Sequence, residues 1–166
     1  MKRLLSILVL FFSATTVVAQ YSFSGNANGT ISVSAIQSIS IIGGTTIPSL
    51  SSLDDYFNGV VMSNYVTATI KSNVSWVVVV QAQNNYFTAM SSGASTNMPA
   101  SVLSLKTSSS GTYLSLNTNG INLKTGNKTG NSISGTNFNV DMKFNPGFNF
   151  KGGIYSIALL YTLTPQ

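Results

Sequence analysis

The stretch Val74-Ser75-Trp76-Val77-Val78-Val79-Val80-Gln81-Ala82 decides the fold of this chain. In an extended chain Trp76, Val78 and Ala82 lie on one face, and the valines at the centre of the other face make that face apolar as well. A short run that is apolar on both faces predicts a central, deeply buried strand. We interpret Trp76, the only tryptophan, and Val78 as anchors of the core; a sugar-stacking role for Trp76 is the weaker alternative.

Alternation with a period of two recurs near both ends of the chain. Before the C-terminus, a run to Leu163 predicts a strand whose inward residues are further core anchors: Tyr155, Ile157, Leu159 and Tyr161. After Thr30, a second run predicts an edge strand available for strand exchange or assembly, with these residues on one face: Ile31, Val33, Ala35, Ile39 and Ile41.

Shorter segments complete the predicted sheets. Strands are expected over Tyr65–Lys71, Ser101–Thr107, Thr112–Asn117, Ile121–Lys124 and Phe138–Phe144. Asn117–Gly120 predicts a hairpin turn, and Ser51–Asp55 predicts one helical turn that ends near Asn58-Gly59. About eight to ten short strands with no interleaved helices predict an all-β fold, an antiparallel immunoglobulin-like β-sandwich.

The N-terminus has the pattern of a secretory signal peptide. Lys2 and Arg3 precede an apolar run over Leu4–Phe12, and small residues end at Ala19. The run is shorter than the roughly 20 residues that span a bilayer, which disfavours a membrane anchor. We therefore expect a signal peptide over 1–19, a single β-sandwich domain over 20–166, and an exported protein at the cell surface or outside the cell, with the periplasm as the alternative.

The side chains that catalysis most often uses are almost absent. The chain has no histidine and no cysteine, and its only acidic residues are Asp54, Asp55 and Asp141. No Ser-His-Asp or Cys-His set can be built from them, and we expect neither an enzyme nor a bound cofactor. Asp54 and Asp55 are interpreted as acids of a first helical turn; whether they bind calcium with neighbouring oxygens is left open.

Charge is sparse as well as unbalanced. Charged residues make up 7% of the chain, far below the ~25% of an average soluble domain. The lysines that follow Arg3 are scattered and no further arginine occurs, so we expect no nucleic-acid partner. A polar, weakly charged surface tolerates self-association. We predict a structural or adhesive surface protein, a pilus-like or filament-like subunit that associates with itself or with another surface protein.

Aromatic residues leave a second function open. An extracellular carbohydrate-binding module would use exposed rings for stacking on sugars, and the candidates are Tyr21, Phe23, Tyr56, Phe57, Tyr86, Phe87, Tyr113, Phe148 and Phe150. Three or more coplanar, exposed rings on one face would favour glycan partners. Packing of most of these rings in the core or at sheet edges is the simpler interpretation.

Over Asp54–Gln166 the chain resembles small exported surface proteins of Gram-negative bacteria with an immunoglobulin-like or pilin-like sandwich. The resemblance rests on Lys71-Ser72-Asn73 before Trp76, on Met98–Leu103, and on Gly153-Ile154-Tyr155 leading to Tyr161–Thr164. A more distant similarity to WxL-type surface domains lacks their motif, because Val77-Val78 follow Trp76. The resemblance implies a role in adhesive or structural assemblies; unlike the usher-assembled pilins, this chain has Pro165 as its penultimate residue.

Overall fold

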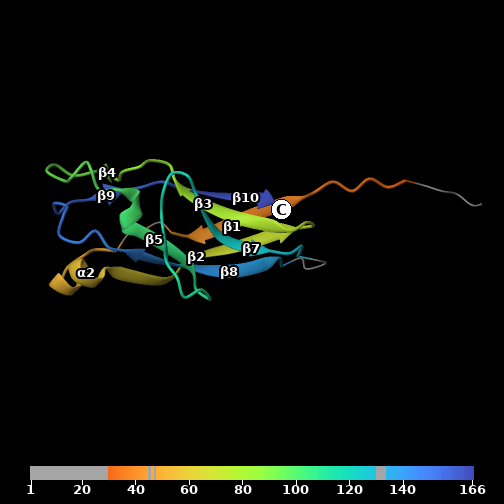
Figure 1. Ribbon diagram of the computed structural model, residues 1–166, viewed down its shortest axis with the longest axis horizontal. Helices are drawn as coiled ribbons and strands as arrows, with labels where there is room; N and C mark the ends of the chain where they lie inside the picture. The colour runs from red at the N-terminus through yellow and green to blue at the C-terminus, as the bar shows by residue number, and fades with distance from the viewer. Residues whose placement is uncertain (1–29, 45, 47, 130–133) are drawn as a thin grey trace, which may run out of the picture. The chain divides into compact units, whose positions relative to one another are not determined.

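The computed structural model describes residues 30–44, 46, 48–129 and 134–166, and the predicted signal peptide lies outside them. Nearly all regular structure in these residues is β (Figure 1). The elements are β1 (Gln37–Gly43), α2 (Leu53–Asn58), β2 (Val60–Ser72), β3 (Trp76–Ala82), β4 (Thr88–Ala89), the 3-10 turn η1 (Ala100–Val102), β5 (Leu103–Thr107), β6 (Leu114–Ser115), β7 (Ile121–Gly126), β8 (Thr136–Phe144), β9 (Tyr155–Ser156) and β10 (Leu159–Pro165).

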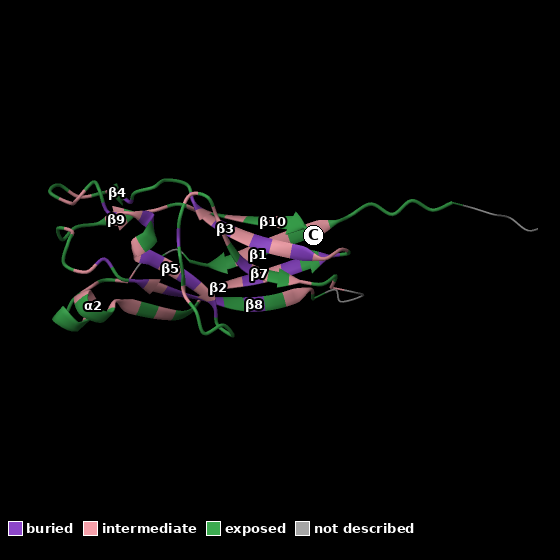
Figure 2. Ribbon diagram, viewed as in Figure 1, coloured by how far each residue is buried: buried purple, intermediate pink, exposed green. Residues whose placement is uncertain are grey.

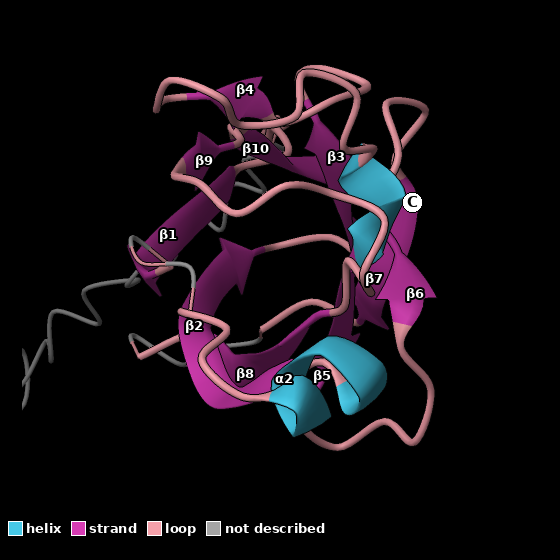
Figure 3. Ribbon diagram, turned by 90° about the vertical axis from the view of Figure 1, so that its left-hand side faces the viewer, coloured by secondary structure: helices cyan, strands magenta, loops and turns pink. Residues whose placement is uncertain are grey.

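These elements lie within residues 34–166 and form two main antiparallel sheets. The larger sheet has the order β1-β2-β8-β5-β6, the smaller has the order β10-β3-β7, and β4 pairs separately with β9. Figure 3 looks along this arrangement and shows the two sheets facing each other across the core, with α2 at the near end. The prediction of an antiparallel, sandwich-like all-β fold is confirmed.

The core fills the space between the two sheets. Inward residues of β2, β3, β5 and β8 are almost completely buried, as the purple segments of Figure 2 show. The Trp76 ring stacks on Phe138 at 6.4 Å between centroids, and its Nε1 donates to the Asn127 carbonyl at 2.8 Å. A Cβ atom on Gly126 would lie 2.3 Å from the indole, so only glycine fits opposite this ring.

The other face of β3 is less covered than its composition suggests. β3 is the central strand of the smaller sheet, as predicted, but only its even-numbered residues from Trp76 to Ala82 are buried. Val77 and Val79 are half-buried. The expectation of deep burial on both faces is therefore wrong, because the loop at Gly120, where a Cβ would lie 2.7 Å from Val79 Cγ1, covers that face only in part.

The first strand is shorter than its alternation predicts. β1 begins at Gln37, which pairs with Ser72 at the end of β2. After Ser72 the chain turns away from the line of β2. The side chain of Asn73 then replaces the strand pairing: it accepts from Ile36 N at 2.8 Å and donates to Ser34 O at 2.9 Å. Without a partner strand, residues 30–36 are extended but form no sheet, so the predicted strand over Ile31 to Ala35 is wrong.

The predicted hairpin is wrong as well, because its two flanking strands have other partners. Asn117–Gly120 is not a hairpin, because β6 pairs with β5 whereas β7 pairs with β3 in the other sheet. Leu116 N donates to Leu103 O, while the next carbonyl, of Asn117, accepts from Ala82 N. The segment therefore crosses from one sheet to the other.

The closing strand is likewise not continuous. It divides into β9, which pairs with β4, and β10, which pairs with β3. The division falls where β3 ends, because Leu159 pairs with Ala82, the last residue of β3. The preceding residues of the run therefore find another partner strand.

Candidate functional site

The predicted core anchors separate into two groups. Trp76 and Val78 are buried at the centre of the smaller sheet. The remaining four are half-buried and pack against the edge of the core: Tyr155, Ile157, Leu159 and Tyr161. All six side chains contribute to the core, but those near the C-terminus keep part of their surface exposed.

The predicted assembly edge also separates into two parts. Ile39 and Ile41 lie in β1 and pack inward against the core, where they are half-buried. Ile31, Val33 and Ala35 precede β1 and are exposed, with 88% of Ile31 and 78% of Val33 accessible to solvent. We call residues 30–36 the arm.

Asp54 and Asp55 are first-turn acids of α2, as predicted. Asp55 completes a capping box: its Oδ2 accepts from Ser52 N at 2.9 Å, and Ser52 Oγ accepts from Asp55 N at 3.2 Å. Hydrogen bonds from the backbone N–H groups of Ser51 and Ser52 lower the Asp55 pKa. Asp54 Oδ1 accepts from Asn58 Nδ2 at 2.6 Å. Both carboxylates are thus engaged within the helix and its cap.

Asp141 stabilises a bulge between β2 and β8. The register of this pair shifts between Met62 and Val66, and Asn64 within the shift has a φ of 53°. Asp141 Oδ1 accepts from Asn64 N at 2.9 Å and from Ser108 Oγ at 2.5 Å, and Oδ2 lies 3.6 Å from Lys106 Nζ. The Ser108 hydrogen bond, followed by the Asn64 one, holds the Asp141 pKa below its usual range.

Each carboxylate therefore has local, structural partners. Across the residues that the structure describes, no hydrogen bond joins Asp141 to Asp54 or Asp55. The same residues contain no group of three or more His, Cys, Asp or Glu side chains that could hold a metal ion. These carboxylates stabilise the start of a helix and a bulge between two strands.

Three of the aromatic candidates form a cluster, the half-buried Tyr56 with the exposed Phe57 and Phe148, rather than a platform. Tyr56 on α2 stacks on Phe148 with centroids 5.2 Å apart and an interplanar angle of 20°, and Phe57 meets Phe148 edge-on at 73°. Phe87 is buried against Phe144. Of the other candidates, Tyr86 is exposed, Tyr113 and Phe150 are half-buried, and Tyr21 and Phe23 lie outside the described residues.

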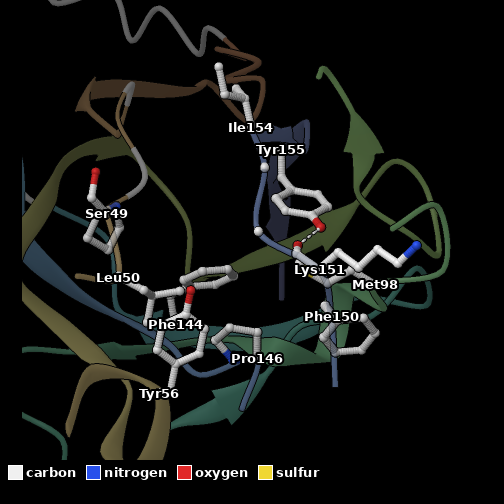
Figure 4. Close-up of a pocket in the computed structure, with 13 residues that line it drawn as sticks. Ser49, Leu50, Tyr56, Met98, Phe144, Pro146, Phe150, Lys151, Ile154 and Tyr155 are labelled. Carbon is white, nitrogen blue, oxygen red and sulfur yellow. Dashed lines mark hydrogen bonds between the residues drawn. The ribbon is translucent and has the colours of Figure 1, made fainter. Parts of the chain in front are cut away.

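A pocket of about 370 Å³ opens beside this cluster, at the end of the sandwich where α2 lies (Figure 4). Its lining comes from α2, from the end of β8, from the start of β9 and from three loops: Pro48, Ser49, Leu50, Tyr56, Met98, Phe144, Pro146, Phe150, Lys151, Gly152, Gly153, Ile154 and Tyr155. Most of these side chains are apolar or aromatic. We call this feature the end pocket.

Backbone hydrogen bonds hold one wall of the end pocket in place. Ser95 Oγ accepts from Lys151 N at 2.9 Å, and Ser91 Oγ accepts from Ile154 N at 2.9 Å. Tyr155 Oη donates to the Lys151 carbonyl and accepts from Ser95 N. A Cβ on Gly153 would lie 2.6 Å from that of Ala94, so glycine allows the two loops to approach.

The opposite wall depends on the end of α2. Gly59 caps the helix with φ 73° and ψ 168°, a region that is essentially restricted to glycine. A Cβ there would lie 2.7 Å from the Phe144 carbonyl oxygen and from Asn145 Cβ. This close approach places Tyr56 beside Phe144 and Pro146.

No sequence pattern predicts the end pocket, although several of its aromatic residues are among the predicted stacking candidates and core anchors. The residues come from segments far apart in the chain, and no periodicity links them. The available signal was local: proline and glycine residues interrupt apolar side chains over 48–50 and 146–154.

None of the described helices has the length and hydropathy to cross a membrane. No protein-family model matches the chain, and comparison with curated proteins also finds no match. Any function proposed for this protein therefore rests on its own residues and their geometry.

Proposed function

We propose that this chain is an exported, non-enzymatic structural subunit that assembles by adding a strand from one copy to an open edge of another. The observation that carries this proposal is an incompletely covered region between β1 and β10. We call this region the seam; it comprises the edges of the two strands and the side chains of Ile39, Ile41, Leu159, Tyr161 and Leu163.

The inward side chains at the seam are only half-buried, in contrast to those of β2, β3, β5 and β8, which we call the inner strands. β1 and β10 have the same pattern, with half-buried inward residues and exposed outward ones, and neither carries a fully buried residue. In Figure 2 these two strands lack the purple segments of β3. An added strand would cover apolar surface here, and burial of such surface stabilises association.

Backbone groups at the seam are also available. In the described residues β1 pairs only with β2, and β10 pairs only with β3. Each strand therefore has one edge with unpaired N–H and C=O groups, which is a template for β-augmentation. Tyr161 Oη adds a buried polar atom that no other described group satisfies.

The arm has the properties of the strand that would be added. Its apolar residues Ile31 and Val33 are exposed and would share one face of a strand, and its sequence alternates as a strand does from Ile31 to Ala35. In the structure residues 30–36 belong to no strand. Pairing with the edge of a second copy would bury these side chains.

The low charge of the chain supports association between copies. Lysines and acids at sheet edges ordinarily prevent edge-to-edge pairing, yet neither β1 nor β10 contains a charged residue. Export remains a prediction from the N-terminal sequence, and a role in a surface structure follows from export together with assembly.

Glycan binding is the second candidate, and the observation that bears on it is the partly exposed cluster of Tyr56, Phe57 and Phe148. Because Tyr56 and Phe148 stack on each other and Phe57 meets them edge-on, the three rings do not form a flat platform. The cluster geometry gives sugar binding less support than the seam gives assembly. A glycan array with specific hits would reverse this order.

The proposal is tested by sedimentation velocity over a wide range of protein concentrations, with electron microscopy of the same samples. Wild-type protein is expected to form larger species as its concentration rises. The double variant Ile31→Lys and Val33→Lys should stay monomeric, because charges cannot be buried at the seam.

The matched control carries Ser32→Lys and Ser34→Lys, which add the same charge to the other side of the arm and should leave assembly intact. A wild-type protein that is monomeric at every concentration would refute the proposal. Equal loss of assembly in both variants would show that net charge, and not the apolar face of the arm, controls association.

A further inference from the structure

The end pocket is separate from the seam, and the proposed assembly does not use it. We propose that it binds a small uncharged aromatic molecule that carries one hydroxyl or carbonyl group. The inference is independent of self-association, since it rests only on the size, lining and polarity of the pocket.

The size of the pocket sets the size of the ligand. Its volume of about 370 Å³ lies near the lower end of the roughly 300–1,000 Å³ that small-molecule sites occupy. A polymer segment or a long lipid chain would extend well beyond such a pocket. A single ring system with few substituents fits the volume.

The lining favours an aromatic body. Tyr56, Phe150 and Tyr155 come from different elements and, together with Phe144, surround the space in Figure 4. Aromatic side chains bind rings in offset-stacked or edge-to-face geometry, and such contacts add to the gain from apolar burial. Leu50, Met98 and the two prolines supply further apolar contacts.

Few polar side-chain groups of the lining remain free to form a hydrogen bond with a bound molecule. Tyr155 Oη is already engaged as donor and acceptor between Lys151 O and Ser95 N. Ser49 Oγ and Tyr56 Oη also line the pocket, and neither forms a hydrogen bond with another described group. In Figure 4 Tyr56 Oη is directed toward the interior of the pocket, whereas Ser49 Oγ points away from Tyr56. Tyr56 Oη is therefore the group that a ligand hydroxyl or carbonyl would meet.

The charges near the end pocket favour an uncharged ligand. Lys151 contributes to the lining, but Figure 4 shows its ammonium group extending away from the space between Tyr56 and Ile154. The acids of α2 are engaged elsewhere, Asp55 in the capping box and Asp54 with Asn58. A buried charge on the ligand would thus lack a partner, which is unfavourable.

The walls are positioned before any ligand binds. Hydrogen bonds from Lys151 N to Ser95 Oγ and from Ile154 N to Ser91 Oγ fix the loop that leads to Tyr155, and the Gly59 cap fixes α2 against the end of β8. A preformed site loses less conformational entropy on binding.

The test is a titration of the 15N-labelled protein with phenol and with toluene, which differ only in the hydroxyl and methyl groups, followed by two-dimensional NMR. Saturable shifts that are confined to residues lining the end pocket are expected with both probes, and tighter binding is expected for phenol. Absence of saturable shifts, or shifts spread over the whole surface, would overturn the proposal.

Two variants assign the contacts. Tyr56→Phe keeps the ring and removes the hydroxyl, so it should weaken phenol binding roughly threefold to tenfold and leave toluene binding unchanged. Ile154→Asp places a charge at the wall and should weaken both probes by about tenfold or more. Equal phenol affinity in wild type and Tyr56→Phe would remove Tyr56 from the proposed site.

The matched control is Ile42→Asp, since Ile42 and Ile154 are both 67% exposed and Ile42 does not line the pocket. This variant should bind both probes as wild type does. If Ile154→Asp abolishes self-association and neither probe binds to wild type, the pocket receives a segment of another copy, and the small-molecule proposal is wrong.

Discussion

The inner strands and the seam are made of similar residues but differ in how fully they are covered. Ile70 on β2, Val80 on β3 and Leu105 on β5 are completely buried, because each strand has a neighbour on both sides and a sheet opposite. Ile39, Ile41 and Leu163 alternate just as regularly, yet each is half-buried because β1 and β10 are edge strands. Alternation therefore predicts which face of a strand points inward and does not predict how completely that face is covered.

The sharpest test of this comparison is the same substitution in both regions. Leu105→Ala removes a side chain that is 0% exposed and is expected to lower the free energy of unfolding by roughly 2–5 kcal/mol. Leu163→Ala at the seam should cost about half as much or less, because part of its surface is already in contact with water. Urea unfolding of monomeric protein measures both values, and equal losses would show that the seam is as well packed as the inner core.

A second test concerns Asp141, the buried acid on β8. Asp141→Asn removes the charge that accepts from Asn64 N and Ser108 Oγ beside Lys106, and we expect a loss of about 1–3 kcal/mol. The pKa of Asp141 is lower in the folded protein than its ordinary value of 3.8. Its contribution is therefore present above that value and lost as the pH falls below about 4.

Unfolding curves of wild type and Asp141→Asn between pH 7 and pH 3 measure this contribution. The difference in stability between the two proteins should shrink at the acid end. A difference that stays constant down to pH 3 would contradict the assignment.

The smallest expected effect belongs to the seam. Tyr161 Oη is buried without a partner among the described residues, and burial raises the Tyr161 pKa to about 12, with a smaller contribution from Tyr65. Tyr161→Phe removes this unsatisfied hydroxyl and should leave the stability of the monomer unchanged or raise it by up to about 1 kcal/mol. Thermal unfolding measures the change, and a clear loss of stability would mean that the hydroxyl has a partner in solution.

The raised pKa of Tyr161 also predicts that the folded protein loses stability at high pH. Because the folded state holds the tyrosine neutral up to about pH 12, the stability that wild-type protein derives from it is present below pH 10 and decreases above it. Tyr161→Phe should lose less stability than wild type over this range.

Sequence patterns predicted single elements well and pairings poorly. The capping residues at Ser52 and Asp55 identified α2, and the apolar run around Trp76 identified the central strand of the smaller sheet. The hairpin at Asn117–Gly120 failed because its flanking strands pair with β5 and β3, which lie in different sheets. Turn-forming residues permit a reversal of the chain, but the choice of partner depends on contacts between residues far apart in sequence.

The candidate sites show the same division. Alternation alone led to the prediction of an assembly edge that includes the arm and the β1 part of the seam, since alternation is a property of a single stretch of chain. The end pocket was missed because Leu50, Tyr56, Phe150 and Tyr155 are brought together only when α2 and the loops meet at one end of the sandwich. No local pattern encodes that meeting.

The sequence by itself determined the fold class, the alternation of the strands, the start of α2 and the scarcity of catalytic groups, because these depend on side-chain chemistry and on periods of a few residues. Only the tertiary structure decided where β1 begins, which strands pair, that β1 and β10 border an open seam, and that a pocket lies beside α2. These features depend on which segments, far apart in the sequence, lie next to each other in the fold. The Gln37–Ser72 pairing shows the reason, because a strand extends only as far as its partner strand does.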